Sequence, residues 1–258
     1  MGFITPAPPP VDIEDWKAKP HLERIKPLAK DLAVNGFGTP SVLPLLYLAK
    51  MAVWAFGALL VLSATKGLGG IGSFSHWWTQ SIVFQKVVVW TVVWEMLGVG
   101  GGTGPLMFRF TPPIGGALWW LRPGTMRLPA WPDKVPLTKG SRRTLFDVGL
   151  YTGMLGVGIA LLASGGDHVA GSAAGRLDPI LIAVMLGLWL ALGLRDKVAY
   201  FCGRPEVYGM MLIVSLFPPH NFIVGWQIAM LTIWLGAATS KLNRHFPSVV
   251  AAMMANTP

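Results

Sequence analysis

The sequence has few charged residues and almost no cysteine. Asp, Glu, Lys and Arg make up only 13% of its 258 residues, about half the fraction typical of a soluble globular domain. The single cysteine, Cys202, excludes an internal disulfide framework and a metal site built from cysteines alone. The charged, proline-rich start of the chain has no early apolar segment, so we expect no secretory signal peptide.

Apolar residues dominate instead, at 53% of the chain, with 12 tryptophans of the kind that collect at membrane interfaces. A bilayer core of about 30 Å needs roughly 20 apolar residues in a helix. The sequence therefore predicts an all-α, polytopic integral membrane helix bundle. Five apolar stretches are the expected transmembrane spans: 42–64, 82–100, 145–163, 179–194 and 208–238.

The fifth stretch is interrupted by two prolines, Pro218 and Pro219. They remove two backbone donors, so the helix is expected to kink or break there. The stretch is either one broken span or a short re-entrant piece followed by a full span. The predicted organisation is a cytoplasmic N-terminal segment 1–41, a transmembrane domain 42–240 and a C-terminal tail 241–258.

The net charge of +9 is distributed unevenly between the loops. Lys and Arg gather in 1–41, in the loop 101–143 and after the fourth span, while the loops after the first and third spans hold only Lys66 and Arg176. This alternation follows the positive-inside rule and predicts a plasma-membrane protein with a cytoplasmic N-terminus. Lys241 and Arg244 would then lie outside, a conflict that leaves a re-entrant fifth region open. Nucleic-acid binding is not expected.

The loop 101–143 combines tryptophans with basic residues, among them Trp119, Trp120 and Arg122. Aromatic rings and long cationic side chains are typical of a membrane surface, where one end of the side chain is apolar and the other hydrated. We therefore expect a lipid-binding cytoplasmic loop with a short helix near 117–121. An ordinary packed loop is the alternative.

A glycine cluster, GVGGGTG at 98–104, joins the second span to this loop. No register matches the Gly-x-Gly-x-x-Gly pattern of a dinucleotide site, and no Gly-Lys-Ser/Thr ending follows. Gly100, Gly102 and Gly104 are instead predicted to end the span and to line a cavity, since irregular backbone at membrane depth must be covered by protein or face water.

Four ionisable residues lie within or at the ends of the predicted spans: Lys50, Lys86, Glu95 and Asp147. A charge inside the membrane is costly and usually has a partner or a function. Lys86 is expected to extend its ammonium to the outer interface. Lys50, Glu95 and Asp147 are predicted to form a buried polar cluster in the cytoplasmic half, with Arg109 near its mouth. A salt bridge that only joins helices is the alternative.

The five histidines show no metal-ligand spacing, so no metal site is predicted, and the sequence does not identify a cofactor. His220, beside the two prolines, is the histidine that most suggests a function, because broken membrane helices expose backbone groups that bind ligands. A simple kink is the alternative. The candidate acid or base residues are therefore Glu95, Asp147 and His220.

Four segments carry a resemblance to a known family: GFGTP at 36–40, GGTGPLMFRFTPPIGG at 101–116, LRPGTMRLPAWPDKVPLT at 121–138 and NRHFPSVVAAMMANTP at 243–258. The chain resembles actinobacterial, mycobacterial-type transmembrane proteins of unknown function. The resemblance implies a role in making cell-envelope glycolipids, in the maturation of lipomannan towards lipoarabinomannan. Members of that family continue into further spans, so the chain is expected to match their N-terminal part.

These observations favour an accessory or scaffold protein, not itself an enzyme, that binds membrane lipids and other membrane subunits. Its expected lipid- or ligand-binding residues are Lys50, Glu95, Gly100, Gly102, Gly104, Arg109, Trp119, Trp120 and Arg122. The first alternative is a membrane-embedded lipid-modifying enzyme. The second is a transporter or channel component, which the absence of a detectable sequence repeat disfavours.

Overall fold

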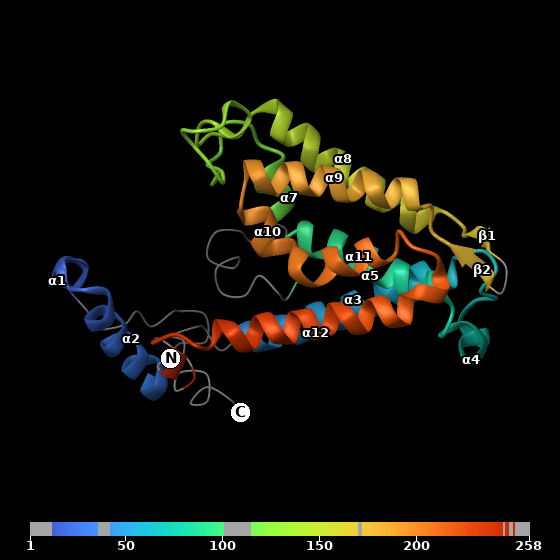
Figure 1. Ribbon diagram of the computed structural model, residues 1–258, viewed down its shortest axis with the longest axis horizontal. Helices are drawn as coiled ribbons and strands as arrows, with labels where there is room; N and C mark the ends of the chain where they lie inside the picture. The colour runs from blue at the N-terminus through green and yellow to red at the C-terminus, as the bar shows by residue number, and fades with distance from the viewer. Residues whose placement is uncertain are drawn as a thin grey trace. The chain divides into compact units, whose positions relative to one another are not determined.

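The computed structural model describes residues 12–35, 42–100, 115–169, 172–244, 246–247 and 250. This part of the chain is mostly helical, as the sequence predicts (Figure 1). The chain divides into two units, each described by itself: Lys50–Leu231, called the helical unit below, and the segments Met1–Ala49 and Thr232–Pro258.

The N-terminal segment contains two helices, α1 (Ile13–Ala18) and α2 (His21–Asn35). Asp12 caps α1 by accepting hydrogen bonds from the backbone N–H groups of Glu14 and Asp15, at 2.9 and 3.1 Å. The indole of Trp16 donates to the carbonyl of Arg24 at 3.0 Å and so ties the two helices together.

Long apolar helices form the framework of the helical unit. They are α3 (Val42–Ser63), α5 (Ser81–Met96), α8 (Leu145–Ala163), α9 (Pro179–Arg195) and α12 (Phe222–Ser240). The first residues of α3, up to Ala49, and the last residues of α12, from Thr232, belong to the other unit. Their boundaries follow local chemistry. Thr144 and Asp147 form a capping box at the start of α8, Asp178 caps α9 ahead of a proline, and Gly98 adopts a φ of +79° just after α5.

Shorter elements connect these helices. They are η1 (Ile71–Ser73), α4 (Phe74–Trp77), α7 (Gly115–Trp120), η2 (Pro136–Thr138), β1 (Asp167–Val169), β2 (Ser172–Arg176), α10 (Val198–Gly203), the π-helical η3 (Pro205–Gly209), α11 (Met210–Val214) and η4 (Pro219–Asn221). β1 and β2 pair as an antiparallel hairpin between α8 and α9. The helix α7 agrees with the short helix predicted near 117–121.

Two helices of the described chain are long and apolar enough to cross a membrane: Leu145–Ala163 and Pro219–Ser240. Three apolar helical segments are shorter: Leu48–Ser63, Pro179–Arg195 and Pro205–Val214. A prediction of five full-length spans therefore goes beyond what helix lengths alone support. The second predicted span, 82–100, corresponds to a helix that ends at Met96.

The predicted break at Pro218 and Pro219 is confirmed. Helix α11 ends at Val214, and α12 begins at Phe222 after the turn η4. The two helices pack antiparallel: the Trp226 indole donates to the Met211 carbonyl at 3.5 Å, and Gly225 lies against Val214. The fifth region is thus a short helix followed, after the turn η4, by a long one.

The core of the helical unit lies between α5, α8, α9 and α11. Figure 1 shows α8 and α9 side by side, with the β1–β2 hairpin at one end of the pair. Between apolar helices in lipid, close packing and polar bonds hold helices together, since lipid is as apolar as their side chains. Gly158 provides such an approach, because a Cβ there would lie 2.6 Å from Cγ2 of Val93.

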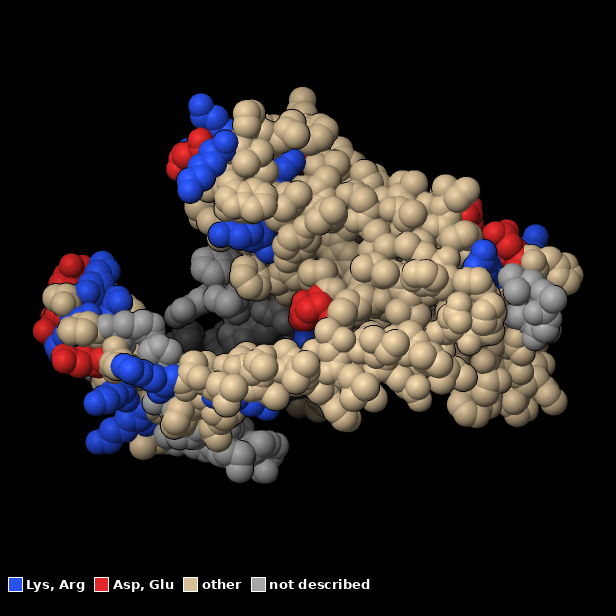
Figure 2. All heavy atoms as spheres, viewed as in Figure 1, with Lys and Arg blue, Asp and Glu red and all other residues tan. Residues whose placement is uncertain are grey.

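Charge is nearly absent from the middle of this pair of helices. In Figure 2 the surface over α8 and α9 is almost entirely uncharged, and basic and acidic side chains gather toward the two ends of the pair. This distribution fits helices that cross an apolar layer.

Candidate functional site

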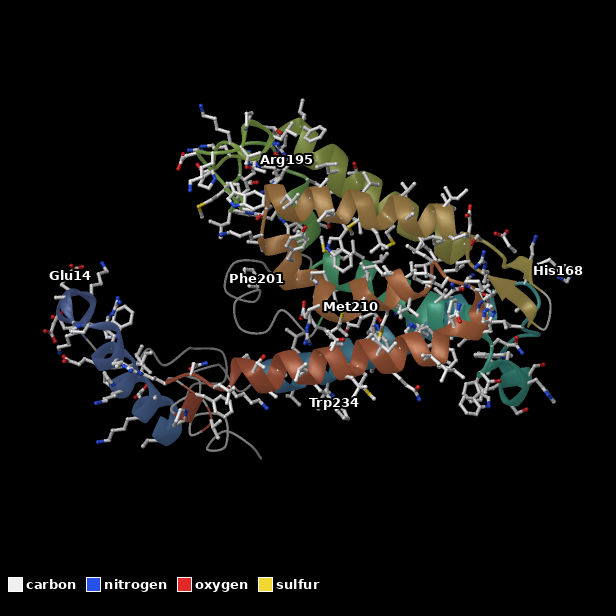
Figure 3. The ribbon with its side chains drawn as sticks, viewed as in Figure 1. Glu14, His168, Arg195, Phe201, Met210 and Trp234 are labelled. Atoms are coloured by element: carbon white, nitrogen blue, oxygen red, sulfur yellow. The ribbon has the colours of Figure 1, made fainter. Side chains whose placement is uncertain are left out.

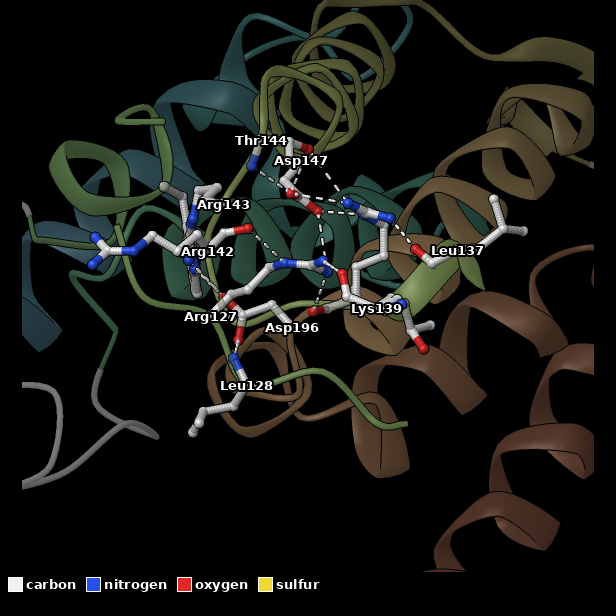
Figure 4. Close-up of polar contacts among 12 residues, drawn as sticks. Arg127, Leu128, Leu137, Lys139, Arg142, Arg143, Thr144, Asp147 and Asp196 are labelled. Atoms are coloured by element: carbon white, nitrogen blue, oxygen red, sulfur yellow. Dashed lines mark hydrogen bonds and ion pairs between the residues drawn. The ribbon is translucent and has the colours of Figure 1, made fainter. Parts of the chain in front are cut away.

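A buried ionic network lies where α8 begins and α9 ends. It consists of Arg127, Arg143, Asp147, Arg195 and Asp196 and is called the arginine cluster below (Figure 4). Asp147 sits in the first turn of α8, where its Oδ2 accepts from the Thr144 backbone N–H at 2.7 Å and hydroxyl at 2.8 Å. Arg195, the last residue of α9, donates to both carboxylate oxygens, with Nη2 at 3.1 Å from Oδ2.

Asp196 forms the second half of the arginine cluster. Its Oδ2 accepts from Nη2 of Arg143 at 2.6 Å and from the Trp120 indole at 3.2 Å. Its Oδ1 accepts from the backbone N–H of Leu128 at 3.2 Å. Burial lowers the pKa of the Arg143 guanidinium, and the charge of Asp196 partly offsets that effect. One carboxylate therefore joins α7, the following loop and the end of α9.

Arg127 is 2% exposed and contacts both the loop before α8 and the end of α9. It donates to three backbone carbonyls, those of Arg142 at 3.0 Å, Arg195 at 2.9 Å and Lys139 at 2.6 Å. Its Nη1 also lies 3.7 Å from Oδ1 of Asp147. The three arginines exceed the two aspartates in charge, and the carbonyls supply the remaining acceptors. These partners indicate a structural role for Arg127, because a buried charge is tolerated only when other groups in the protein compensate it.

The cluster changes the expected environment of Asp147. The sequence placed Asp147 beside Lys50 and Glu95, but its contacts in the described chain are with Thr144 and two arginines. Trp120, predicted as a lipid contact, is instead 2% exposed and bonded to Asp196. Asp196 and Arg127 lie outside the predicted spans, where charge is common, so the sequence does not single them out.

A second polar site surrounds Glu95, on the last turn of α5. Glu95 is 5% exposed, and a Cβ on Gly100 would lie 1.9 Å from its Oε2. The carboxylate thus occupies the space that the glycine leaves free. Lys50, half-buried on α3, lies within electrostatic reach of Glu95. The structure brings three predicted site residues close together, whereas Gly102, Gly104 and Arg109 lie outside the described residues.

Cys202, on α10, lies in the same part of the helical unit and is electrostatically linked to Glu95. Its side chain is 1% exposed, and burial raises the pKa of the thiol to about 12. Because the thiolate is the nucleophilic form, a thiol with this environment is unreactive at neutral pH. Cys202 is a packing residue and not a nucleophile.

A third polar site, at the start of α5, was not expected. Lys86 is 1% exposed and donates to the hydroxyl of Thr65 and to the carbonyls of Leu162 and Ser164, at 2.8, 2.8 and 2.7 Å. The expected extension of this side chain to the interface is therefore wrong. The ammonium instead caps the C-terminal end of α8, where the helix dipole favours a cation. Gln85 beside it bonds Leu177 and Ser215.

Two of the candidate acid or base residues, Asp147 and His220, lie at opposite ends of the α8–α9 pair. Asp147 contacts Arg195 at one end of the α8–α9 pair. His220 is exposed in η4, next to Phe217, whose carbonyl accepts from Arg176 of β2 at the other end. Figure 3 shows this separation through its labelled residues, with Arg195 at one end of the pair and His168 at the other. No group of three or more His, Cys, Asp or Glu within the described ranges could hold a metal ion.

Comparison with known proteins identifies a family. The family model described as a transmembrane protein of unknown function (DUF3556) matches residues 1–258, the whole of this chain. No curated protein and no solved structure matches the chain.

Proposed function

Because the chain belongs to this family of transmembrane proteins, we propose that it is an accessory or scaffold protein of the plasma membrane. In this role it is one subunit of a larger membrane assembly, and it binds lipid and partner proteins in cell-envelope lipid or glycolipid metabolism. The envelope setting rests on the resemblance of its sequence motifs to mycobacterial-type proteins.

The observation that carries the proposal is the environment of Asp147. The carboxylate is held by the capping box and by Arg195 at the end of α9, so it is committed to joining helices. A general acid or base must instead reach its substrate and exchange a proton. His220 is exposed in η4, at the other end of the α8–α9 pair, so Asp147 and His220 do not form a catalytic pair.

A second function has support from one site. Glu95 is buried on the last turn of the apolar helix α5, beside Gly100 and near Lys50. A carboxylate at this depth is a functional candidate by default. The alternative function is therefore a membrane-embedded lipid-modifying enzyme that uses Glu95 as acid or base.

Complementation separates the two functions. In a strain lacking the gene, we would measure envelope lipids and glycolipids by mass spectrometry after expressing the wild type, Glu95→Gln or His220→Ala. A scaffold predicts that both variants restore the lipid profile when their protein amounts match the wild type. An abundant Glu95→Gln protein that restores nothing would contradict the scaffold role and favour the enzyme.

We also propose an orientation in the membrane. Successive helices of the helical unit run antiparallel: Tyr151 near the start of α8 donates to Met96 at the end of α5, and Lys86 near the start of α5 bonds the end of α8. If α3 starts in the cytoplasm, the alternation of directions brings the end of α9 back to the cytoplasmic side. Helix α11 then starts on the cytoplasmic side, and α12, antiparallel to it, ends there. Five spans and one short helix then place Lys241 and Arg244 in the cytoplasm, which removes their conflict with the positive-inside rule.

Labelling tests this orientation. Lys66→Cys and Lys241→Cys would be treated with a membrane-impermeant maleimide in intact cells and after permeabilisation, while the buried Cys202 stays unlabelled. The proposal predicts labelling of Lys66→Cys in intact cells and of Lys241→Cys only after permeabilisation. Labelling of both in intact cells would contradict it.

A further inference from the structure

The loop between α7 and α8 is a folded surface element. Gly124 and Arg127 donate backbone hydrogen bonds to Arg143 and Ser141, both at 2.8 Å, and Arg143 returns one to Thr125 at 2.8 Å. Two further bonds, from Ala130 to Leu194 at 3.0 Å and from Lys197 to Leu128 at 2.7 Å, fasten it to the end of α9. We call residues 117–146 the basic platform.

The basic platform exposes large apolar side chains where α8 begins. Leu137, Leu145 and Phe146 are 73%, 76% and 58% exposed. They are neighbours, because Arg195 donates to the Leu137 carbonyl and its guanidinium lies 5.0 Å from the Phe146 ring centroid. An apolar patch of this kind at the end of an apolar helix is suited to the boundary between lipid headgroups and acyl chains.

The basic platform also exposes cations. Arg122, Lys134, Lys139 and Arg142 are exposed, against one exposed acid on the loop, Asp133. The platform's buried arginines are paired with Asp147 and Asp196, so the exposed cations remain available for an external anion. In Figure 2, basic side chains lie at this end of the α8–α9 pair.

We propose that the basic platform binds anionic phospholipid headgroups of the membrane that the apolar helices cross. Leu137, Leu145 and Phe146 rest among the upper acyl chains, while Arg122, Lys134 and Lys139 contact the lipid phosphates. The arginine cluster keeps the platform folded, so binding does not have to order a flexible loop. The proposal rests on the lipid-binding part of the scaffold role and adds the lipid class and the residues.

Lipid selectivity of the purified full chain tests the proposal. The protein would be equilibrated in mixed micelles with equal amounts of phosphatidylglycerol and phosphatidylcholine, and the retained lipids counted by mass spectrometry. The test variant is Arg122→Gln/Lys134→Gln/Lys139→Gln. Its matched control keeps the charge as Arg122→Lys/Lys134→Arg/Lys139→Arg, and Lys66→Gln removes one cation elsewhere.

We expect the wild type to enrich phosphatidylglycerol, and salt to weaken the enrichment, since charges on a surface are screened within about 8 Å at physiological ionic strength. Each cation removed should lower the enrichment by up to about fivefold, with the charge-keeping variant and Lys66→Gln close to the wild type. Equal phosphatidylglycerol enrichment in the wild type and the glutamine variant would overturn the proposal. A loss of enrichment in Lys66→Gln as large as that in the glutamine variant would overturn it too.

The measurement also separates this proposal from the scaffold role. If the glutamine variant loses lipid selectivity yet complements the gene deletion, the platform binds lipid but the envelope role lies elsewhere. If it keeps selectivity, the platform proposal fails while the scaffold role still depends on the Glu95→Gln result. A circular dichroism spectrum unchanged from the wild type shows that the variant is folded in either case.

Discussion

Replacing Asp196 by Asn removes the charge that offsets the burial of Arg143 while keeping the shape of the side chain. Asp196 is 2% exposed and Arg143 4%, and their closest atoms, Oδ2 and Nη2, are 2.6 Å apart. Removing one partner of a buried pair leaves an uncompensated charge and costs about 3–5 kcal/mol. Asn can still accept from Leu128, so we expect the lower end, about 3 kcal/mol.

Thermal unfolding in detergent measures this cost, with a dye that fluoresces on reaction with a thiol. Cys202 is the only cysteine and is buried, so it reacts as the fold opens. A loss of about 3 kcal/mol lowers the Tm of a chain of this size by roughly 6–12 °C. Asp133→Asn, an exposed position, is the matched control and should leave the Tm nearly unchanged.

A double-mutant cycle completes this prediction. Adding Arg143→Gln to Asp196→Asn removes both charges, so the double variant should lose less stability than the two single variants together. Equal Tm values for Asp196→Asn and Asp133→Asn would refute the structural role of the cluster. Additive losses would show that Arg143 and Asp196 do not act as a pair.

Three further predictions concern stability, and the first two use the same unfolding assay. Lys86→Met should leave the half-buried carbonyls of Leu162 and Ser164 without this donor and cost roughly 1–3 kcal/mol, and Lys86→Arg should lose less. Equal Tm values for the wild type and Lys86→Met would contradict this. Gly203→Ala should lower the Tm because its Cβ would lie 2.3 Å from the Trp189 ring, whereas Gly187→Ala, with open space around it, should not. Burial raises the pKa of Cys202 from about 9 to about 12, so its contribution to stability is complete below pH 9 and lost as the pH rises toward 12. Circular dichroism should show that Cys202→Ala has a flatter dependence of Tm on pH over that range.

Much of the fold could be predicted from the sequence because apolar length and proline act locally. The helical class follows from runs such as 145–163, and the break follows from Pro218 and Pro219, which lack backbone donors. Helix lengths were harder to predict. The predicted span 82–100 includes Gly98 and Gly100, but α5 ends at Met96, just before Gly98 adopts a φ of +79°.

The candidate site was only partly predictable, because partners depend on which helix ends meet. The charge of Glu95 within an apolar run drew attention to it, and Lys50 lies within its electrostatic reach. The partners of Asp147 could not be found in this way. Arg195 follows an apolar run and Arg127 lies in a loop, and only the antiparallel packing of α8 on α9 brings them together.

The polar sites also explain how apolar helices can keep a fixed register. In lipid, the association of apolar helices depends on close packing and on polar contacts, since lipid is as apolar as their side chains. The arginine cluster fixes α8 to the end of α9 through Asp147 and Arg195. Lys86 fixes the opposite end of α8 to α5. Buried polar contacts at both ends of α8 therefore set its register, and neither contact needs a role in catalysis. Glu95 precedes Met96, whose carbonyl accepts from Tyr151 near the start of α8, and its function is best judged from activity at equal protein abundance and not from stability.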